Sequence, residues 1–154
     1  MRYYLAYGSN LSVEQMAYRC PDAIYVGTGE LKDMRLEFHG VRNYSYLTVE
    51  PFKGGTVPVV VWRVSAADEK NLDRYEGYPK SYYKQDVNIK IHSLLNGKEI
   101  GKRHAFLYKM CDGRGCAKPS DVYWNTCLDG YEHFGFDVNL LFDAYDLSLT
   151  KEVI

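Results

Sequence analysis

The chain has 154 residues, 46% of them hydrophobic, so it is long enough for one domain with a proper core and too short for two. Its 19 Lys and Arg residues nearly balance 20 Asp and Glu residues, and the net charge of −1 offers no basic surface for nucleic acid or an anionic membrane. The longest apolar run, residues 57–62, contains a proline and is too short to cross a bilayer. We therefore expect a cytoplasmic, single-domain protein whose partner is a small molecule.

Cysteine and tyrosine usage adds to this expectation. The four cysteines should be reduced, because a chain of this size with an ample core needs no disulfide framework. Tyrosine occurs 15 times, and its rings are expected to line the interior or a pocket. Buried tyrosine hydroxyls need hydrogen-bond partners, which a polar cleft supplies.

The N-terminal stretch combines a short strand with a glycine corner. Residues 4–7 favour a strand, and Gly8 lets a ligand come close to the main chain. Ser12, with Gln15 three residues on, predicts a capping box that opens a helix. A strand, a glycine corner and the first turn of a helix, in this order, leave several backbone N–H groups unpaired. Such groups suit an anion or a developing oxyanion. A plain turn at residues 8–10 is the alternative.

A region of strands follows the first helix, which Cys20-Pro21 should stop. A bend or bulge is expected at residues 27–29 and a turn at Gly54-Gly55. Ser65 then caps a second helix that ends at Gly77. The predicted strands of this region are residues 23–27, 31–38, 46–49 and 57–64.

Glu76 stands out in the last turn of the second predicted helix. It lies four residues after Leu72 and should lean toward the interior, although its charge faces the negative end of the helix dipole at a cost of about 0.3–1 kcal/mol. This position and the surrounding tyrosines push the pKa of its carboxyl upward, as a general base that later serves as acid requires. The alternative is a structural glutamate that bonds to tyrosines or pairs with Lys80 or Lys84.

The clearest hairpin lies in the second half of the chain. Residues 82–92 alternate between apolar and polar, Asn96-Gly97 is a strong turn signal, and residues 103–110 form the return strand. The loop that follows carries Cys111 and Cys116, which lack the two-residue spacing of zinc knuckles. No second Cys or His pair stands nearby at ligand spacing, so no metal is expected.

Two helices complete the chain. Pro119-Ser120 open a helix that ends near Gly135, and a last helix is expected at residues 138–145. The tail, residues 147–154, is of uncertain order, and its apolar residues would suit a homodimer contact. Strands with a few helices, mixed rather than alternating, indicate an α+β fold with a curled or barrel-like sheet. In the helix that Pro119-Ser120 open, four residues fall on one face and form an apolar stripe: Tyr123, Cys127, Tyr131 and Phe134.

Three segments together resemble the gamma-glutamylcyclotransferase family in order and spacing. They are the stretch Tyr4-Leu5-Ala6-Tyr7-Gly8-Ser9-Asn10-Leu11, the segment Leu72-Asp73-Arg74-Tyr75-Glu76-Gly77-Tyr78-Pro79, and Pro119-Ser120-Asp121-Val122-Tyr123. The resemblance covers about residues 3–137, and the dipeptides Gly130-Tyr131 and Phe134-Gly135 resemble the C-terminal helix of the family. It implies a small mixed β-barrel whose cavity floor is the Tyr-Gly-Ser-Asn loop, and conversion of a γ-glutamyl amide into 5-oxoproline and a free amine.

The resemblance also implies roles for single residues. Glu76 matches the acid/base glutamate of the family, and a pocket tyrosine of some members is replaced here by Phe106, so that Tyr108 on the same strand face is expected to substitute for it. This departure leaves the amine specificity open. The expected substrate-binding residues are Tyr4, Leu5, Ala6, Tyr7, Gly8, Ser9, Asn10, Tyr108 and Tyr123.

The implied chemistry needs no cofactor. In a γ-glutamyl amide the α-amine can reach its own side-chain carbonyl, so the nucleophile is tethered to its target. The protein must supply a base, a proton donor for the departing nitrogen, and N–H groups for the oxyanion. Glu76 can serve as base and then acid, while the Gly8 loop can hold either the substrate carboxylate or the oxyanion.

Two other functions remain as alternatives. One is a non-catalytic module that binds a small molecule or peptide with the Tyr7-Gly8-Ser9-Asn10 loop. The other is a phosphate-binding or hydrolase role for the same loop, which would require a lysine after the glycine corner or a base near Ser9, and neither is evident.

Overall fold

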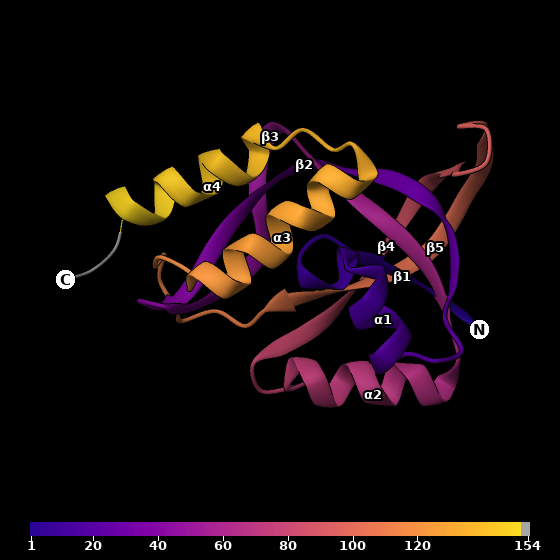
Figure 1. Ribbon diagram of the computed structural model, residues 1–154, viewed down its shortest axis with the longest axis horizontal. Coiled ribbons are helices and arrows are strands. Elements are labelled where there is room, and N and C mark those ends of the chain that lie inside the picture. The colour runs from indigo at the N-terminus through magenta and orange to yellow at the C-terminus, as the bar shows by residue number, and fades with distance from the viewer. Residues whose placement is uncertain (152–154) are drawn as a thin grey trace.

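Five β-strands close into a barrel in the order β1-β3-β2-β4-β5. They are seen in a computed structural model that describes residues 1–151 (Figure 1). Strand β1 (Arg2–Ala6) runs antiparallel to β3 (Tyr44–Val64) and parallel to β5 (Glu99–Met110), which makes the sheet mixed. The predicted α+β class with a small mixed barrel is therefore confirmed.

Strands β2 (Ile24–Val41) and β3 form one long antiparallel ribbon, where the sequence suggested four shorter strands. The turn expected at Gly54-Gly55 is wrong, because both residues lie within β3. There Lys32 pairs with Thr56 and Met34 with Pro51, so four residues of β3 bulge opposite Asp33. The Asp33 side chain accepts a hydrogen bond from the Gly54 N–H at 3.0 Å, which stabilises the bulge without ending the strand.

The predicted bend at residues 27–29 is also a bulge within a continuous strand. The register of β2 against β3 shifts between Tyr25 and Gly27, and Gly27 pairs on its other side with Ser93 of β4 (Tyr82–Ser93). A Cβ at Gly27 would lie 2.0 Å from the His92 carbonyl oxygen, so only glycine allows β4 to close the barrel here. The hairpin of β4 and β5 is confirmed.

The helices begin and end close to the predicted residues. Helix α1 (Val13–Arg19) is capped by Ser12, although the Gln15 side chain does not complete the capping box, since its Oε1 has no partner in the described part of the chain. A turn of 3₁₀ helix, η1 (Ser9–Leu11), precedes it. Helix α2 (Ala66–Glu76) has a full capping box at Ser65, and Gly77 ends it in the left-handed conformation.

The C-terminal helices are α3 (Asp121–Phe134) and α4 (Asn139–Thr150). The predicted stripe of α3 is confirmed, because Cys127 and Tyr131 are buried while the other two members pack against the core. Helix α4 continues five residues past its expected end because the apolar period extends beyond Tyr145, so residues 147–150 are helical rather than a loose tail. The rest of that predicted tail, residues 152–154, lies outside the described residues.

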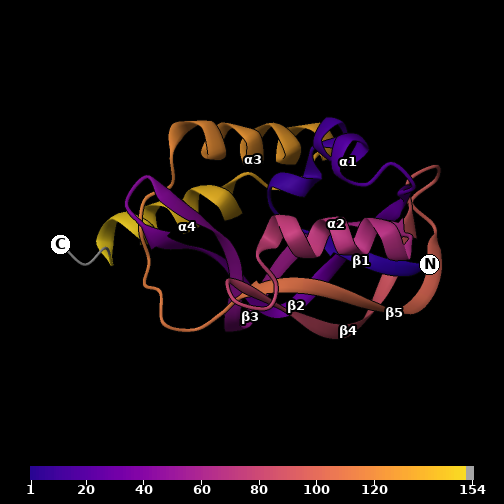
Figure 2. The same cartoon turned by 90° about the horizontal axis from the view of Figure 1, so that it is seen from below.

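Three helices gather over one side of the strands, as Figure 2 shows for α1, α2 and α3. Helix α3 packs on η1, α1 packs on both η1 and α2, and α4 lies along β2. The segment that follows β1 is thus held between helices rather than exposed as a surface turn. No helix within residues 1–151 is long and apolar enough to span a membrane.

The closest of these helix contacts is made by Gly130 of α3. A Cβ at this position would lie 2.6 Å from the Leu11 Cβ, below any normal separation. Gly130 therefore allows α3 to press directly on η1, and Leu11 beneath it is 1% exposed. The position of η1 is set by a backbone contact that any side chain would displace.

We expect Gly130→Ala to destabilise the protein despite the better helix propensity of alanine. Replacing an interior glycine gains about 1 kcal/mol in helix propensity, whereas overpacking a close contact costs about 1–3 kcal/mol. Urea unfolding should therefore show a net loss of up to about 2 kcal/mol. Asn125→Ala, at an exposed position of the same helix, is the control and should be neutral or slightly stabilising. A more stable G130A protein would contradict the role of this contact.

Candidate functional site

A cavity of about 350 Å³ opens where η1, the end of α2 and strands β3, β4 and β5 meet. Strand β1 contributes its Tyr4, and the loop between β5 and α3 contributes Arg114. The cavity is lined by Tyr4, Tyr7, Gly8, Ser9, Asn10, Tyr46, Leu47, Arg74, Tyr75, Glu76, Gly77, Ser81, Tyr82, Tyr108, Arg114 and Tyr123.

Most of the predicted site residues meet in this cavity. Glu76, the Gly8 loop and the tyrosines expected from β1, β5 and α3 all line it. Leu5 and Ala6 do not, because their side chains are buried in the core at 0% and 1% exposure. Phe106 is also fully buried, whereas Tyr108, two residues along β5, reaches the cavity.

Glu76 is placed in the cavity by the last turn of α2. Leu72, one turn earlier on the same helix, is fully buried and fixes the face that turns inward. Within residues 1–151 the Glu76 carboxyl has no hydrogen bond or ion pair, and Lys84 pairs instead with Glu69 and Asp73. Burial raises the pKa of Glu76 from 4.5 to about 7, with the positive charge of Arg19 acting in the opposite direction. The carboxyl can therefore accept and return a proton near neutral pH.

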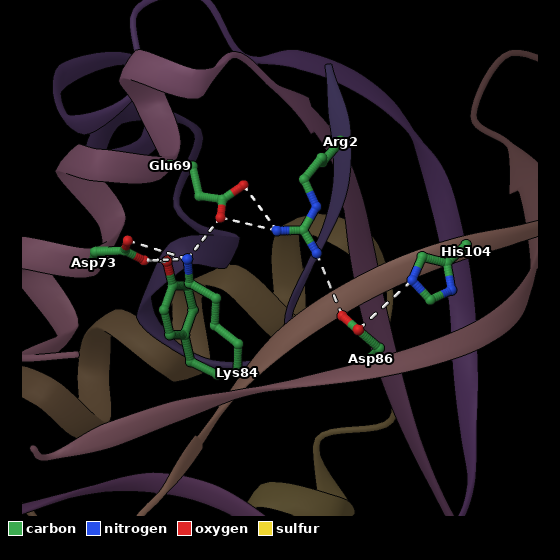
Figure 3. A network of polar contacts seen from close by, with 7 residues as sticks. Arg2, Glu69, Asp73, Lys84, Asp86 and His104 are labelled. Atoms are coloured by element: carbon green, nitrogen blue, oxygen red, sulfur yellow. Dashed lines mark hydrogen bonds and ion pairs between the residues drawn. The ribbon is translucent and has the colours of Figure 1, made fainter. Parts of the chain in front are cut away.

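Helix α2 is held on the barrel by a network of charges (Figure 3). Lys84 of β4 lies 2.6 Å from a Glu69 oxygen and 2.8 Å from an Asp73 oxygen, and Arg2 of β1 lies 2.9 Å from Glu69. The Tyr108 hydroxyl donates a 2.6 Å hydrogen bond to Asp73. Because three strands bind the helix through these contacts, the helix end that carries Glu76 is fixed relative to the cavity.

A second network orders the wall beside Glu76. The Asn10 side-chain amide donates a 2.9 Å hydrogen bond to the Tyr4 hydroxyl, and the Asn10 carbonyl oxygen accepts one from Arg19. The Arg19 guanidinium also stacks on the Tyr75 ring, 3.3 Å from its centroid. Burial and the nearby Glu76 raise the pKa of Tyr4 well above its ordinary value, so its phenol stays neutral.

Other tyrosine hydroxyls in the cavity wall bind the backbone. Tyr7 donates to the Tyr108 carbonyl at 2.5 Å, and Tyr82 donates to the Leu47 carbonyl at 2.9 Å. The Tyr123 hydroxyl accepts a 3.0 Å hydrogen bond from the Leu47 N–H. These bonds link Tyr7, which precedes the Gly8 loop, to β5, β4 to β3, and α3 to β3. They give the three cavity hydroxyls the partners that the tyrosine-rich composition predicted, whereas the buried hydroxyls of Tyr25 and Tyr131, away from the cavity, have no partner within residues 1–151.

Residues 8–10, the Gly8 loop, line one side of the cavity. The N–H groups of Gly8, Ser9 and Asn10 donate to no protein acceptor within the described residues, while the Gly8 and Ser9 carbonyls accept the first bonds of the next turns. A Cβ at Gly8 would lie 3.2 Å from the Tyr123 hydroxyl oxygen, so the loop is pressed against α3. Three successive donors thus remain available to an anion, as the order of strand, corner and helix predicted.

Sequence reasoning missed the arginines around this site. Arg114 comes from the loop after β5, to which the sequence assigned no role, and Arg74 precedes Glu76 by two residues. Arg19, which faces Asn10 and Tyr75, lies nine residues after Asn10 at the end of α1. Nothing local distinguishes these arginines from surface residues, because the contacts that define them join separate elements.

Comparison with known proteins bears on what this cavity does. A family model described as gamma-glutamyl cyclotransferase, AIG2-like, matches residues 4–126. The chain belongs to this gamma-glutamyl cyclotransferase family. Residues 4–6 of strand β1, the Gly8 loop, Glu76 and Tyr123 lie within the matched residues. The resemblance seen in the sequence motifs is therefore confirmed.

Individual relatives agree with the family assignment. A gamma-glutamylcyclotransferase from Mus musculus is 33% identical over 142 residues, covering 86% of this chain and 71% of the mouse protein. One from Bos taurus is 32% identical over 108 residues, covering 63% of this chain, and the chain spans about half (54%) of the bovine protein. A solved gamma-glutamyl cyclotransferase structure matches with a TM-score of 0.73 at 25% identity, over 93% of this chain and 85% of that one.

The raised pKa of Glu76 in this family member predicts a pH-dependent effect of Glu76→Gln on stability. The folded protein holds the Glu76 proton up to about pH 7, while the unfolded chain releases it near 4.5. The wild-type carboxyl therefore destabilises the fold progressively as pH rises through this window. The stability of E76Q relative to wild type should increase from pH 5 to pH 8 in urea unfolding.

Glu14→Gln is the matched control, because Glu14 is exposed on α1 and makes no contact with the cavity. Its effect on stability should not follow the same trend. An E76Q stability difference that is equal at the two pH values would show that the Glu76 pKa is not raised.

Proposed function

We propose that the chain cyclises a γ-glutamyl amide, releasing 5-oxoproline and a free amine or amino acid. One observation carries the proposal: within residues 1–151 the Glu76 carboxyl has no partner, and it lines the same cavity as residues 8–10, whose N–H groups donate to no protein acceptor in that range. Membership of the gamma-glutamyl cyclotransferase family supports it. The cavity volume of about 350 Å³ is that of a small-molecule site.

The substrate brings its own nucleophile to this reaction. Attack of the α-nitrogen on the γ-carbonyl carbon forms the ring bond, and the amide C–N bond then breaks. Intramolecular attack of this kind carries effective molarities of about 10⁵–10⁸ M, so the protein needs neither a nucleophile nor a cofactor. Its task is to move protons and to stabilise the tetrahedral intermediate.

Glu76 carries the protons in both directions. The α-ammonium must lose one proton before it attacks and a second once the ring bond has formed, while the departing nitrogen gains two protons and leaves as an ammonium. A carboxyl with a pKa of about 7 is matched to both transfers. The Glu76 carboxylate returns to its starting state at the end, and no water is consumed.

The charges around Glu76 suit an anionic substrate. Among the lining residues the charged side chains are Arg74, Glu76 and Arg114, which gives two positive charges and one negative. A γ-glutamyl substrate carries an α-carboxylate, and its reaction develops a negative oxygen. The Gly8 loop N–H groups supply donors to one of these anions, and the arginines attract the substrate electrostatically.

Tyr108 takes the place of the pocket tyrosine that Phe106 replaces. Its ring lines the cavity and packs edge-on against Tyr4 at 5.8 Å between centroids. Its hydroxyl is committed to Asp73. Tyr108 therefore meets the substrate with its ring rather than with a hydrogen bond, which favours an apolar portion of the leaving amine at this wall.

Incubation with a panel of γ-glutamyl amino acids and γ-glutamyl amines should yield 5-oxoproline from at least one member, detected by mass spectrometry. Glu76→Gln should reduce kcat by at least about 100-fold, since a positioned acid/base contributes about 10²–10⁴-fold. Glu14→Gln should leave the rate unchanged.

Two results would overturn this function. If a panel member raises the Tm but no product forms, the chain is the binding module that uses the same loop. If E76Q keeps full activity, another group carries the protons.

The pH profile of kcat/KM tests the protonation state of Glu76 directly. Because the base must be ionised, kcat/KM should level off above about pH 7 and fall about tenfold per pH unit below it. This acidic limb of the profile reports the Glu76 pKa. Arg19→Met should move this limb to higher pH, since the Arg19 charge lowers the Glu76 pKa. A limb that stays near pH 4.5 in the wild type, or that moves downward in R19M, would contradict the assignment.

A further inference from the structure

A second group of chemically reactive side chains lies away from the Glu76 carboxyl. Glu37 and His39 of β2 and Cys116 of the loop after β5 place one ligand-type atom each within 4.8 Å of one another. The His39 Nε2 is 2.9 Å from a Glu37 oxygen, and the Cys116 Sγ is 3.6 Å from the same oxygen. Carboxylate, imidazole and thiol are the three protein ligands of zinc.

The backbone holds these groups together without help from the side chains. Glu37 and His39 alternate with the fully buried Phe38, so they share the other face of the strand. The loop runs beside them through an isolated antiparallel β-bridge between His39 and Cys116. Ala117 donates to the Phe38 carbonyl at 3.0 Å, and the Gly40 N–H donates to the Gly115 carbonyl at 3.1 Å.

We propose that Glu37, His39 and Cys116 form a binding site for a divalent cation of the zinc type, with a fourth position left for water. In a tetrahedral site, bond lengths of about 2.0–2.3 Å place ligand atoms about 3.3–3.6 Å apart. The two separations of 2.9 and 3.6 Å around the Glu37 oxygen are close to these values. Binding requires only small side-chain rotations.

The neighbours of the cluster prepare it for a cation. Arg35 donates to the second Glu37 oxygen at 2.9 Å, which orients the carboxylate and leaves the other oxygen facing His39 and Cys116. Coordination replaces the Cys116 thiol proton, which passes to solvent.

The location gives the cation a structural consequence. Cys116 lies two residues after Arg114, which lines the cavity. A cation shared by β2 and the loop would therefore tie the arginine-bearing loop to the barrel. The sequence suggested no metal because the ligand spacing was sought within the loop, whereas Glu37 and Cys116 are 79 residues apart.

The test uses the full chain stripped with a chelator, titrated with ZnCl₂ by calorimetry and with CoCl₂ by absorption spectroscopy. We expect one zinc per chain and a thiolate-to-cobalt charge-transfer band. Removing a group that merely supports a metal ligand costs about 10- to 100-fold in affinity, so Cys116→Ser and His39→Gln should each weaken zinc binding at least tenfold. Cys116→Ser should also abolish the charge-transfer band.

Cys111→Ser is the matched control, because Cys111 lies in the same region and is not part of the cluster. It should bind zinc as the wild type does. With zinc bound, amide hydrogen exchange should slow at residues 112–118. None of these readouts uses the γ-glutamyl reaction, so they stand or fall separately from the proposed function.

The site is overturned if the stripped wild type binds no zinc, or if C116S and H39Q, folded by circular dichroism, bind it as tightly as wild type. It is equally overturned if C111S loses binding as much as C116S does. Unchanged exchange at residues 112–118 in the zinc-bound protein would also contradict it.

Discussion

One ammonium group between two carboxylates sets the geometry on which the site depends. Lys84 meets Glu69 and Asp73, which lie one turn apart on the same face of α2. The Lys84 and Glu69 side chains are only 16% and 17% exposed, so water screens their attraction less than it would at the surface. Since α2 is rigid, fixing these two turns also fixes the turn that carries Glu76.

The same arrangement explains why the Glu76 carboxyl has no partner within the part of the chain that the structure describes. Lys84, one of the two lysines that the sequence offered as its partner, pairs with Glu69 and Asp73 of the same helix. Arg19 is the remaining influence, yet its guanidinium is occupied by Asn10 and the Tyr75 ring. It tempers the Glu76 pKa through space without forming an ion pair, and burial therefore dominates.

Local signals in the sequence were sufficient for most of the fold. Ser65, Gly77, Ser120 and Gly135 mark helix ends because capping is decided by a few adjacent residues. The turn predicted at Gly54-Gly55 is wrong for the opposite reason: adjacent residues do not decide the structure there. Glycines permit a turn or a bulge equally well, and the pairing of β2 with β3 across the bulge decides between them.

The site could be predicted only in part, for a similar reason. Glu76 and the Gly8 loop carry local signals, namely a carboxyl in a last helical turn and a glycine corner between strand and helix. Arg114 and the cluster around Cys116 carry none, since their surroundings come from segments distant in the chain. Leu5 and Ala6 were included because the family resemblance matches residues 4–9 to a substrate loop, but both side chains are buried in the core and do not line the cavity.

Among the residues that line the cavity, the Glu76 carboxyl is the group suited to transferring protons near neutral pH, and the proposed reaction requires one such group. Burial raises the pKa of Tyr4, Tyr7 and Tyr82 further from neutrality. Because the nucleophile is part of the substrate, the cavity does not have to position a second reacting molecule. When the nucleophile is part of the substrate, the proton that leaves one nitrogen is the proton required by the other. A single carboxyl poised near neutrality can then serve both steps, provided that it stays out of water and beside fixed N–H donors.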